Sequence, residues 1–200
     1  MPYVGQTITD VFPTSVSLDT VTTTNLTATN ATASTSLKTP LVEFTDGDDA
    51  IAIADTGVVT MPNQPAFLAK PSSNQNDLSN AGSNIDLVFG TEVFDQNGDF
   101  ASNTFTAPVT GRYNLFAHVY LYNLDSAANV IYITLKTSNR DIFGIIDPDF
   151  GQDNEYWYLA VSMLSDMDAN DTAKVTWLQS GGTAQTDLQA SSYFGGHLAC

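Results

Sequence analysis

The 200-residue chain contains one cysteine, Cys200, at its last position. An intrachain disulfide is therefore excluded, and so is a metal site built from cysteines. Basic side chains are also scarce, since 6 Lys and Arg stand against 22 Asp and Glu, for a formal net charge of −16. Phosphate backbones and anionic bilayer surfaces both attract basic proteins, so we expect no nucleic-acid partner and no binding to an anionic membrane.

Long apolar runs and familiar catalytic motifs are missing as well. No stretch approaches the roughly 18 apolar residues of a membrane helix, so no membrane insertion is expected. The first seven residues show neither a basic start nor an apolar run, so no secretory signal is visible and synthesis in a cytoplasm is expected. The chain lacks G-x-S-x-G, H-E-x-x-H and a phosphate loop, which argues against an enzyme. A glycan-degrading spike stays open as the least favoured alternative, because a glycosidase needs only two placed carboxylates.

What the chain does contain changes near residue 60. Residues 20–39 read TVTTTNLTATNATASTSLKT, a low-complexity tract with few apolar positions. Two interpretations are open: a disordered linker (a mucin-like stalk, if the protein is secreted), or a fibre shaft in which three chains bury the sparse Val and Leu. Three short apolar segments follow at 40–44, 50–54 and 58–60, separated by Asp/Gly turns. Strands this short are not stable alone, so they favour the shaft.

From residue 65 onward the sequence is a series of β-type segments divided by Asn, Asp, Gly, Ser and Pro, with no sustained helical period. Many short strands at regular spacing predict an all-β sandwich or jelly roll of about 135 residues. The expected strands are 65–69, 85–95, 103–107, 112–122, 129–137, 141–146, 156–165, 172–179 and 191–198.

The segment 112–122 is apolar or aromatic on both faces of the expected strand. Because alternate residues point to opposite sides, one face carries Tyr113, Leu115, Ala117, Val119 and Leu121, and the other Asn114, Phe116, His118, Tyr120 and Tyr122. A strand of this kind must be covered on both sides, and a two-sheet sandwich covers only one. A second chain is the favoured cover, and a loop of the same chain is the alternative.

Residues 64–200 resemble the globular head of complement C1q-type proteins, relatives of the tumour necrosis factor jelly roll. The resemblance rests on separated points along the sequence: Gln64-Pro65-Ala66-Phe67-Leu68-Ala69; Phe89, Asp95 and Phe100; Phe105, Gly111 and Tyr113; Asp171 to Leu178; and Tyr193-Phe194-Gly195-Gly196-His197-Leu198. Two departures are a turn before Phe105 that is two residues short, and Leu115 where the family has an aromatic residue. The family's signal peptide and collagen stalk are absent.

The resemblance implies a homotrimer that buries the second face of 112–122. The implied interface residues are Phe116, His118, Tyr120, Tyr122, Tyr193 and His197. It places Tyr193 near Phe116 at the axis, and an antiparallel pairing of these two separates His118 from His197. In the trimer, the three copies of each histidine then form a ring around the axis. We favour ordinary interface contacts for these rings over a metal or anion site.

Carboxylates gather at Asp46/Asp48/Asp49, Asp147/Asp149/Asp153/Glu155 and Asp166/Asp168/Asp171. Most lie in turn-like sequence, where Asp accepts hydrogen bonds from backbone amides, so we expect no cofactor. Ca²⁺ is the alternative for such oxygen-rich loops, and Asp95–Asp99 resembles a fragment of a Ca²⁺ loop without the full spacing. Glycosylation sequons at Asn25, Asn30 and Asn170 are read as chance matches.

A β-shaft leading into a C1q-like head resembles a bacteriophage fibre, and residues 45–60 resemble repeats found before such heads. The sequence-based prediction is therefore a virion protein, assembled in the host cytoplasm. Residues 1–20 anchor it to other virion proteins, 21–62 form the shaft, and 63–200 form a knob for a host-surface glycan or protein or for particle decoration. The alternative is a secreted or cell-surface C1q-like lectin or ligand. Binding residues are not assigned, but the longest polar connections are the candidates: 71–84, 123–128, 147–155 and 180–190.

Overall fold

The structure, a computed structural model, describes residues 41–43 and 49–200. Every regular element in those ranges is a β-strand, which confirms the predicted all-β class. The expected anchor 1–20, the Thr-rich tract 20–39, the sequons at Asn25 and Asn30, and Asp46 and Asp48 lie outside the described residues.

Three short strands precede the sandwich, as predicted: β1 (Leu41–Glu43), β2 (Asp49–Ile53) and β3 (Val59–Thr60). They pair as an antiparallel meander in the order β1-β2-β3. Gly57, at φ +83°, closes the β2–β3 turn by donating its N–H to Ala54 O at 2.8 Å. The apolar side chains of Ile53, Val58 and Val59 are 38–56% exposed, so this meander does not bury its own apolar surface.

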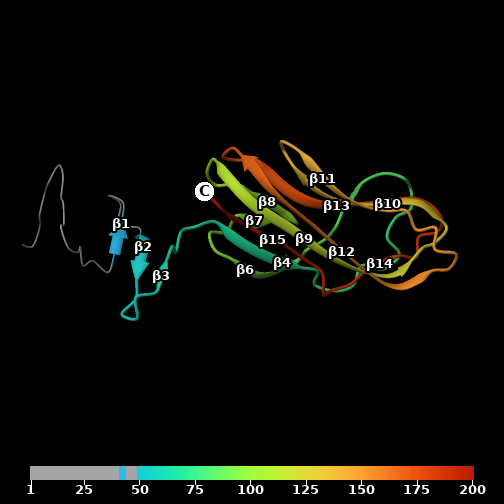
Figure 1. The fold of residues 1–200 in the computed structure, drawn as a ribbon, viewed down its shortest axis with the longest axis horizontal. Coiled ribbons are helices and arrows are strands. Elements are labelled where there is room, and N and C mark those ends of the chain that lie inside the picture. The colour runs from blue at the N-terminus through green and yellow to red at the C-terminus, as the bar shows by residue number, and fades with distance from the viewer. Residues whose placement is uncertain (1–40, 44–48) are drawn as a thin grey trace, which may run out of the picture. The chain divides into compact units, whose positions relative to one another are not determined.

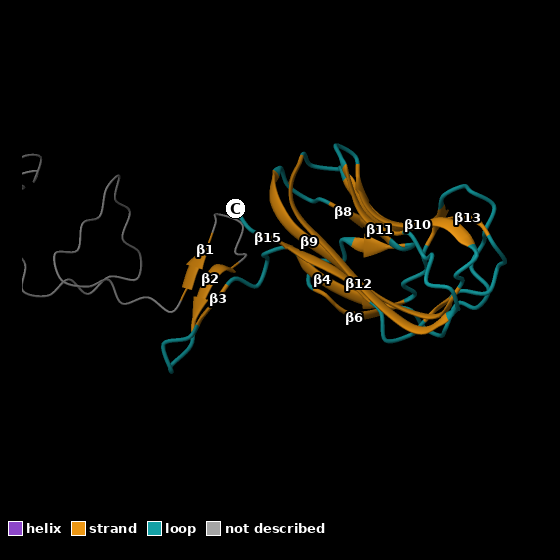
Figure 2. Ribbon diagram, turned by 45° about the vertical axis from the view of Figure 1, so that its right-hand side comes forward, coloured by secondary structure: helices purple, strands orange, loops and turns teal. Residues whose placement is uncertain are grey.

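Two six-stranded antiparallel sheets form the head and face each other across one core (Figures 1 and 2). The first sheet has the order β12-β9-β15-β4-β6, with β14 beside β9, and the second has the order β11-β10-β13-β8-β7, with β5 beside β13. The first contains β4 (Ala66–Lys70), β6 (Thr91–Asp95), β9 (Gly111–Leu124), β12 (Asn154–Met167), β14 (Asp187–Leu188) and β15 (Tyr193–Leu198). The second contains β5 (Ile85–Asp86), β7 (Phe100–Ala101), β8 (Thr104–Thr106), β10 (Ala128–Thr137), β11 (Asp141–Ile146) and β13 (Thr172–Gly181).

The single strand predicted at 85–95 is wrong, because this segment crosses from one sheet to the other. β5 pairs with β13 in the second sheet, whereas β6 pairs with β4 in the first. Leu87 N still donates to Val175 O of β13 at 3.0 Å, and the backbone then leaves both ladders. Val88 exchanges hydrogen bonds with the side chain of Gln75, and Phe89 N donates to Asn103 Oδ1 at 2.9 Å. Leu87 and Phe89 are buried here, so their apolar character marks the crossing and not a continuous strand.

The core is built around aromatic residues from both sheets, and the residues that carried the family resemblance supply much of it. The Phe67 ring stacks on Phe100 and Phe105 at 5.1 and 4.6 Å between centroids, and its edge meets Phe194 at 5.0 Å. Each of these side chains is at most 4% exposed. Burying one aromatic side chain stabilises the fold by about 1.5–3 kcal/mol, so this cluster holds the two sheets together.

Candidate functional site

The outer face of the first sheet carries a band of aromatic side chains, here called the aromatic face. Its members are Phe116, His118, Tyr120 and Tyr122 on β9, Tyr156 and Tyr158 on β12, and Tyr193 on β15. The alternation predicted for β9 is confirmed, since Tyr113, Leu115, Ala117, Val119 and Leu121 are fully buried in the core.

Ring contacts run along this face from one strand to the next. His118 lies 5.2 Å from Phe116 and 5.8 Å from Tyr158, measured between ring centroids. Further along, Tyr156 stacks on Tyr120 at 6.2 Å and meets Tyr122 at 5.2 Å. The rings therefore form two groups in contact, Phe116–His118–Tyr158 and Tyr120–Tyr156–Tyr122, which are neighbours because Tyr158 pairs with Tyr120.

A shallow groove of about 460 Å³ lies at one end of this face, lined by Phe116, His118, Tyr193 and three residues of β4 and β6 (Leu68, Lys70 and Val93). The predicted proximity of Tyr193 and Phe116 is confirmed, but the predicted pairing is wrong by two residues: Tyr193 pairs with His118, and Gly195 with Phe116. A Cβ atom at Gly195 would lie 2.8 Å from Phe116 Cζ. The Phe116 ring occupies the space above the glycine, which sets this register.

The two histidines do not form a joint site within one chain. His118 pairs with Tyr193 and His197 with Asn114, four residues further along β15. At about 3.4 Å per residue this separates them by roughly 13 Å. Both are exposed.

Tyr156 and Tyr158 belong to this face, although sequence reasoning did not include them. They are 58% and 57% exposed and pair with Tyr122 and Tyr120. The alternation Tyr-Trp-Tyr in 156–158 was the available signal. Because no loop within 49–200 covers these tyrosines, the alternative of a covering loop is wrong for the part of the chain that the structure describes.

The four polar connections singled out from the sequence come together at one end of the head. Asp153 Oδ1 accepts hydrogen bonds from Ser126 N and Oγ at 2.9 and 2.7 Å, and its Oδ2 accepts from Gln185 Nε2 at 2.8 Å. Asn80 Nδ2 donates to Gly182 O at 2.8 Å, which adds the connection 71–84. Strand β9 starts beside Cys200 and ends at this cluster, so the loops lie opposite the end where Pro65 meets Leu198.

The loop end carries acidic side chains and no lysine or arginine. Hydrogen bonds at the loop end shift the pKa values of a carboxylate and of a tyrosine. The amides and hydroxyl that bind the Asp153 carboxylate lower its pKa, led by Gln185 and then Ser126. Tyr122 donates its hydroxyl to Glu155 at 3.2 Å, and this hydrogen bond, together with the Glu155 charge, raises the pKa of the tyrosine.

Other carboxylates singled out from the sequence accept hydrogen bonds in turns or form an ion pair. Asp95 accepts hydrogen bonds from the backbone N–H of Asp99 and Phe100 at 3.1 and 2.9 Å, which accounts for the motif that resembled a Ca²⁺ loop. Asp171 accepts from Asp168 N at 2.8 Å, and Asp166 pairs with Arg140. Within residues 41–43 and 49–200, no three His, Cys, Asp or Glu side chains lie close enough together to hold a metal ion. Nor does any helix in those ranges have the length and apolar character to span a membrane.

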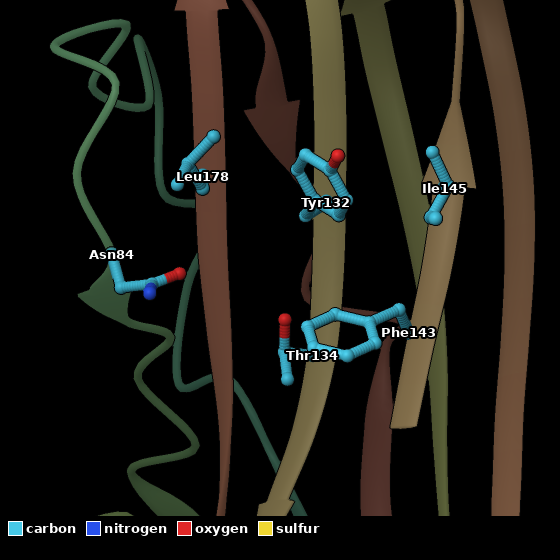
Figure 3. A pocket seen from close by; sticks show the side chains of 6 residues that line it. All are labelled: Asn84, Tyr132, Thr134, Phe143, Ile145 and Leu178. Carbon is cyan, nitrogen blue, oxygen red and sulfur yellow. The ribbon is translucent and has the colours of Figure 1, made fainter. Parts of the chain in front are cut away.

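A second groove, of about 470 Å³, lies on the outer face of the other sheet (Figure 3). It is here called the outer groove, and it is lined by Asn84, Tyr132, Thr134, Phe143, Ile145 and Leu178. Tyr132 of β10 lies between Leu178 of β13 and Ile145 of β11 on adjacent strands. The sequence did not single out this surface.

No protein-family model and no curated protein matches the chain. Among solved structures, the globular domain of the zebrafish complement 1qA protein matches with a TM-score of 0.50 at 18% identity, covering 69% of this chain and 98% of that domain. The head has the C1q-type jelly-roll fold. Murine APRIL matches with a TM-score of 0.48 at 12% identity, covering 68% of this chain and 99% of that one. The predicted C1q-type jelly roll is confirmed as a fold by the match to the zebrafish domain.

Proposed function

We propose that this chain is a homotrimeric fibre protein of a bacteriophage virion. Its C1q-like head binds a host-surface glycan or protein, or decorates the particle, and residues 1–20 attach it to other virion proteins. The role is structural and adhesive and not catalytic. The single observation that carries the proposal is the aromatic face, which one chain leaves in water.

Exposed contiguous apolar surface on this scale marks an interaction site. Tyr156 and Tyr158 are more than half exposed, and Phe116, Tyr120, Tyr122 and Tyr193 are partly exposed. A closed trimer with this face at its axis covers the rings of all three copies with one self-consistent interface.

The direction of the chain supports a fibre. Residues 64–66 enter the head at the end opposite the four clustered connections, so a shaft before residue 63 leaves those connections at the tip. The exposed apolar residues of the β2–β3 region support the shaft, because three meanders around one axis bury what a single meander leaves in water.

Charge constrains the target of such a trimer. Three chains carry 3 × −16 = −48 formal charges, which repel an anionic surface unless cations bridge the two. A neutral or cation-bridged receptor is therefore favoured.

A C1q-like lectin or ligand outside any virion is the second candidate, and the likeness to nearly the whole of the zebrafish C1q domain favours it. One measurement tests both candidates, and a second decides between them. Multi-angle light scattering of the full chain is expected to give three times 21.4 kDa, and a stable monomer contradicts both candidates. Antibody labelling of purified particles in the electron microscope is expected to mark fibre tips. If the particles carry no label, the C1q-like lectin or ligand is the candidate that remains.

A further inference from the structure

The outer groove has the composition of a small-ligand site for an uncharged saccharide, and we propose that it is one. This inference rests on the proposed function, since it names the ligand class that the head takes from a host surface. The proposed site lies on the face of β10, β11 and β13, and not in the polar connections that were the candidates from the sequence.

The floor of the outer groove offers an apolar platform. The rings of Tyr132 and Phe143 meet edge to face, with centroids 6.0 Å apart. Phe143 and Ile145 are 52% and 58% exposed. A pyranose ring has a face of C–H groups that packs on such a surface, and aromatic side chains contribute the largest contact area.

Neutral polar groups surround this platform. Asn84 supplies an amide that both donates and accepts, and Tyr132 and Thr134 supply hydroxyls. Next to Thr134 on the same outer face, Thr176 is 3% exposed, and its Oγ1 has no hydrogen-bond partner in the described part of the chain. An apolar floor with a few converging polar groups is typical of small-ligand sites, and the groove's 470 Å³ lies within their usual range of about 300–1,000 Å³.

The charges beside the groove are already paired. No lining residue is charged. One step further along the strands, Lys136 faces Asp141 at 3.8 Å and Lys174 contacts Asp86 at 2.9 Å. An anionic sugar gains no free cation there and is repelled by the net charge of −16, so the site selects an uncharged ligand.

A second copy of the chain is a poorer occupant. The outer groove and the aromatic face lie on opposite sheets, so a copy bound in the groove is a second interface beyond the closed trimer. Where that contact is heterologous and its rotation does not close, it leads to open assemblies. In a closed trimer the three outer grooves instead point away from the axis. Three weak sugar sites then act together on a surface that presents many copies of the ligand.

The test uses the full chain and a panel of uncharged probes: methyl glycosides of glucose, galactose, mannose and N-acetylglucosamine, with maltose and lactose. Saturation-transfer NMR is expected to show binding of at least one probe, at millimolar dissociation constants that do not change between 50 and 500 mM NaCl. Phe143→Ala is expected to weaken that binding at least tenfold, and Asn84→Ala several-fold. Val109→Ala is the matched control, because Val109 is an apolar residue of similar exposure (46%) on a distant turn, and it is expected to change nothing.

Each contrary result overturns the inference. Binding by no probe rejects the saccharide, and binding that Phe143→Ala leaves intact rejects the outer groove. Binding of these neutral probes that high salt abolishes depends on charged groups of the protein, and it rejects the uncharged lining of the groove as the site. A change of oligomeric mass in Phe143→Ala identifies the groove as a contact between copies. Urea midpoints of the variants check that they fold. Light scattering and particle labelling test the proposed function separately, so a trimeric virion protein that binds no sugar contradicts this inference alone.

Discussion

The carboxylate of Asp125 occupies the space in which a side chain at position 182 would lie. Gly182 has φ +69°, and a Cβ atom there would sit 1.9 Å from Asp125 Oδ2. Asp125 is 2% exposed and accepts hydrogen bonds from Ala127 N at 2.9 Å, from Gln179 Nε2 at 3.1 Å and from Thr183 N. This buried carboxylate thus joins the connection 123–128 to 180–190, and the glycine makes the contact possible.

Gly182→Ala is expected to destabilise the head more than the same change at Gly151. Both glycines have φ near +70°, but nothing lies within 4 Å of a Cβ at Gly151. Gly151→Ala therefore lowers the free energy of unfolding only by the backbone strain, about 1–2 kcal/mol. Gly182→Ala also displaces the buried carboxylate, so its total loss is about 3–4 kcal/mol. Urea unfolding of both variants measures the difference. Equal losses contradict the argument that Asp125 requires the glycine.

Phe116→Asp is expected to convert the proposed trimer into monomers. The substitution places a charge in the aromatic face, where three copies bring three such charges together in a desolvated interface. The mass measured by light scattering is expected to fall from three times 21.4 kDa to 21.4 kDa. Phe143→Asp is the matched control, because it places the same charge on the outer face of the other sheet, and its mass is expected to stay trimeric. A trimeric Phe116→Asp variant rejects the interface.

The alternation of residue types predicted which residues of one strand share a face. It did not predict how neighbouring strands pair. The alternation in β9 predicted its buried and outward faces, because strand geometry fixes which residues share a face. The register that sets Gly195 under the Phe116 ring was not available from the sequence, since it depends on which residue of β15 leaves room for the ring. The crossing at Leu87–Phe89 was missed because a residue buried between sheets has the same apolar character as one within a strand.

The loop cluster and the outer groove also depend on strand order, which the sequence alone did not predict. Polar composition identified the four connections, but the joining of three of them through Asp153 depends on strand order, which brings residues 126, 153 and 185 to one end. The outer groove combines Phe143, Tyr132 and Leu178 from three strands. Each strand alone shows one or two outward apolar residues, which is ordinary for a surface, so only the sheet order reveals the patch.

Acid is expected to open the loop cluster at a pH below the ordinary pKa of aspartate. The pKa of Asp153 in the folded protein is lowered from its usual 3.8 by hydrogen bonds from Gln185 and Ser126. Its contribution to stability is therefore complete above pH 3.8 and is lost as the pH falls through the lower folded value. The amide NMR signal of Ser126, followed from pH 6 to pH 2, is expected to titrate with a midpoint under 3.8 and to lose this transition in Asp153→Asn. A midpoint at or above 3.8 contradicts the hydrogen-bonded carboxylate.

Asp99→Asn is expected to stabilise the head at neutral pH. Burial, and then the charge of Asp95, raises the pKa of Asp99 above 3.8, although the hydrogen bond with Asn97 opposes this, and Asp99 Oδ2 is buried without a partner in the described part of the chain. Because the folded pKa is raised, the ionised carboxylate costs stability, and the full cost is present above the folded pKa and disappears as the pH falls below 3.8.

The gain at pH 7 is expected to be under about 1 kcal/mol, because Asp99 is only partly buried and solvent screens its charge. Urea midpoints at pH 7 and pH 3, measured at equal protein concentration, test this: Asp99→Asn is more stable than the parent at pH 7 and equal to it at pH 3. Asp55→Asn removes the same charge from an exposed turn and controls for the general repulsion within an acidic protein. If both variants gain the same stability at pH 7, the effect comes from the net charge of the protein and not from the environment of Asp99.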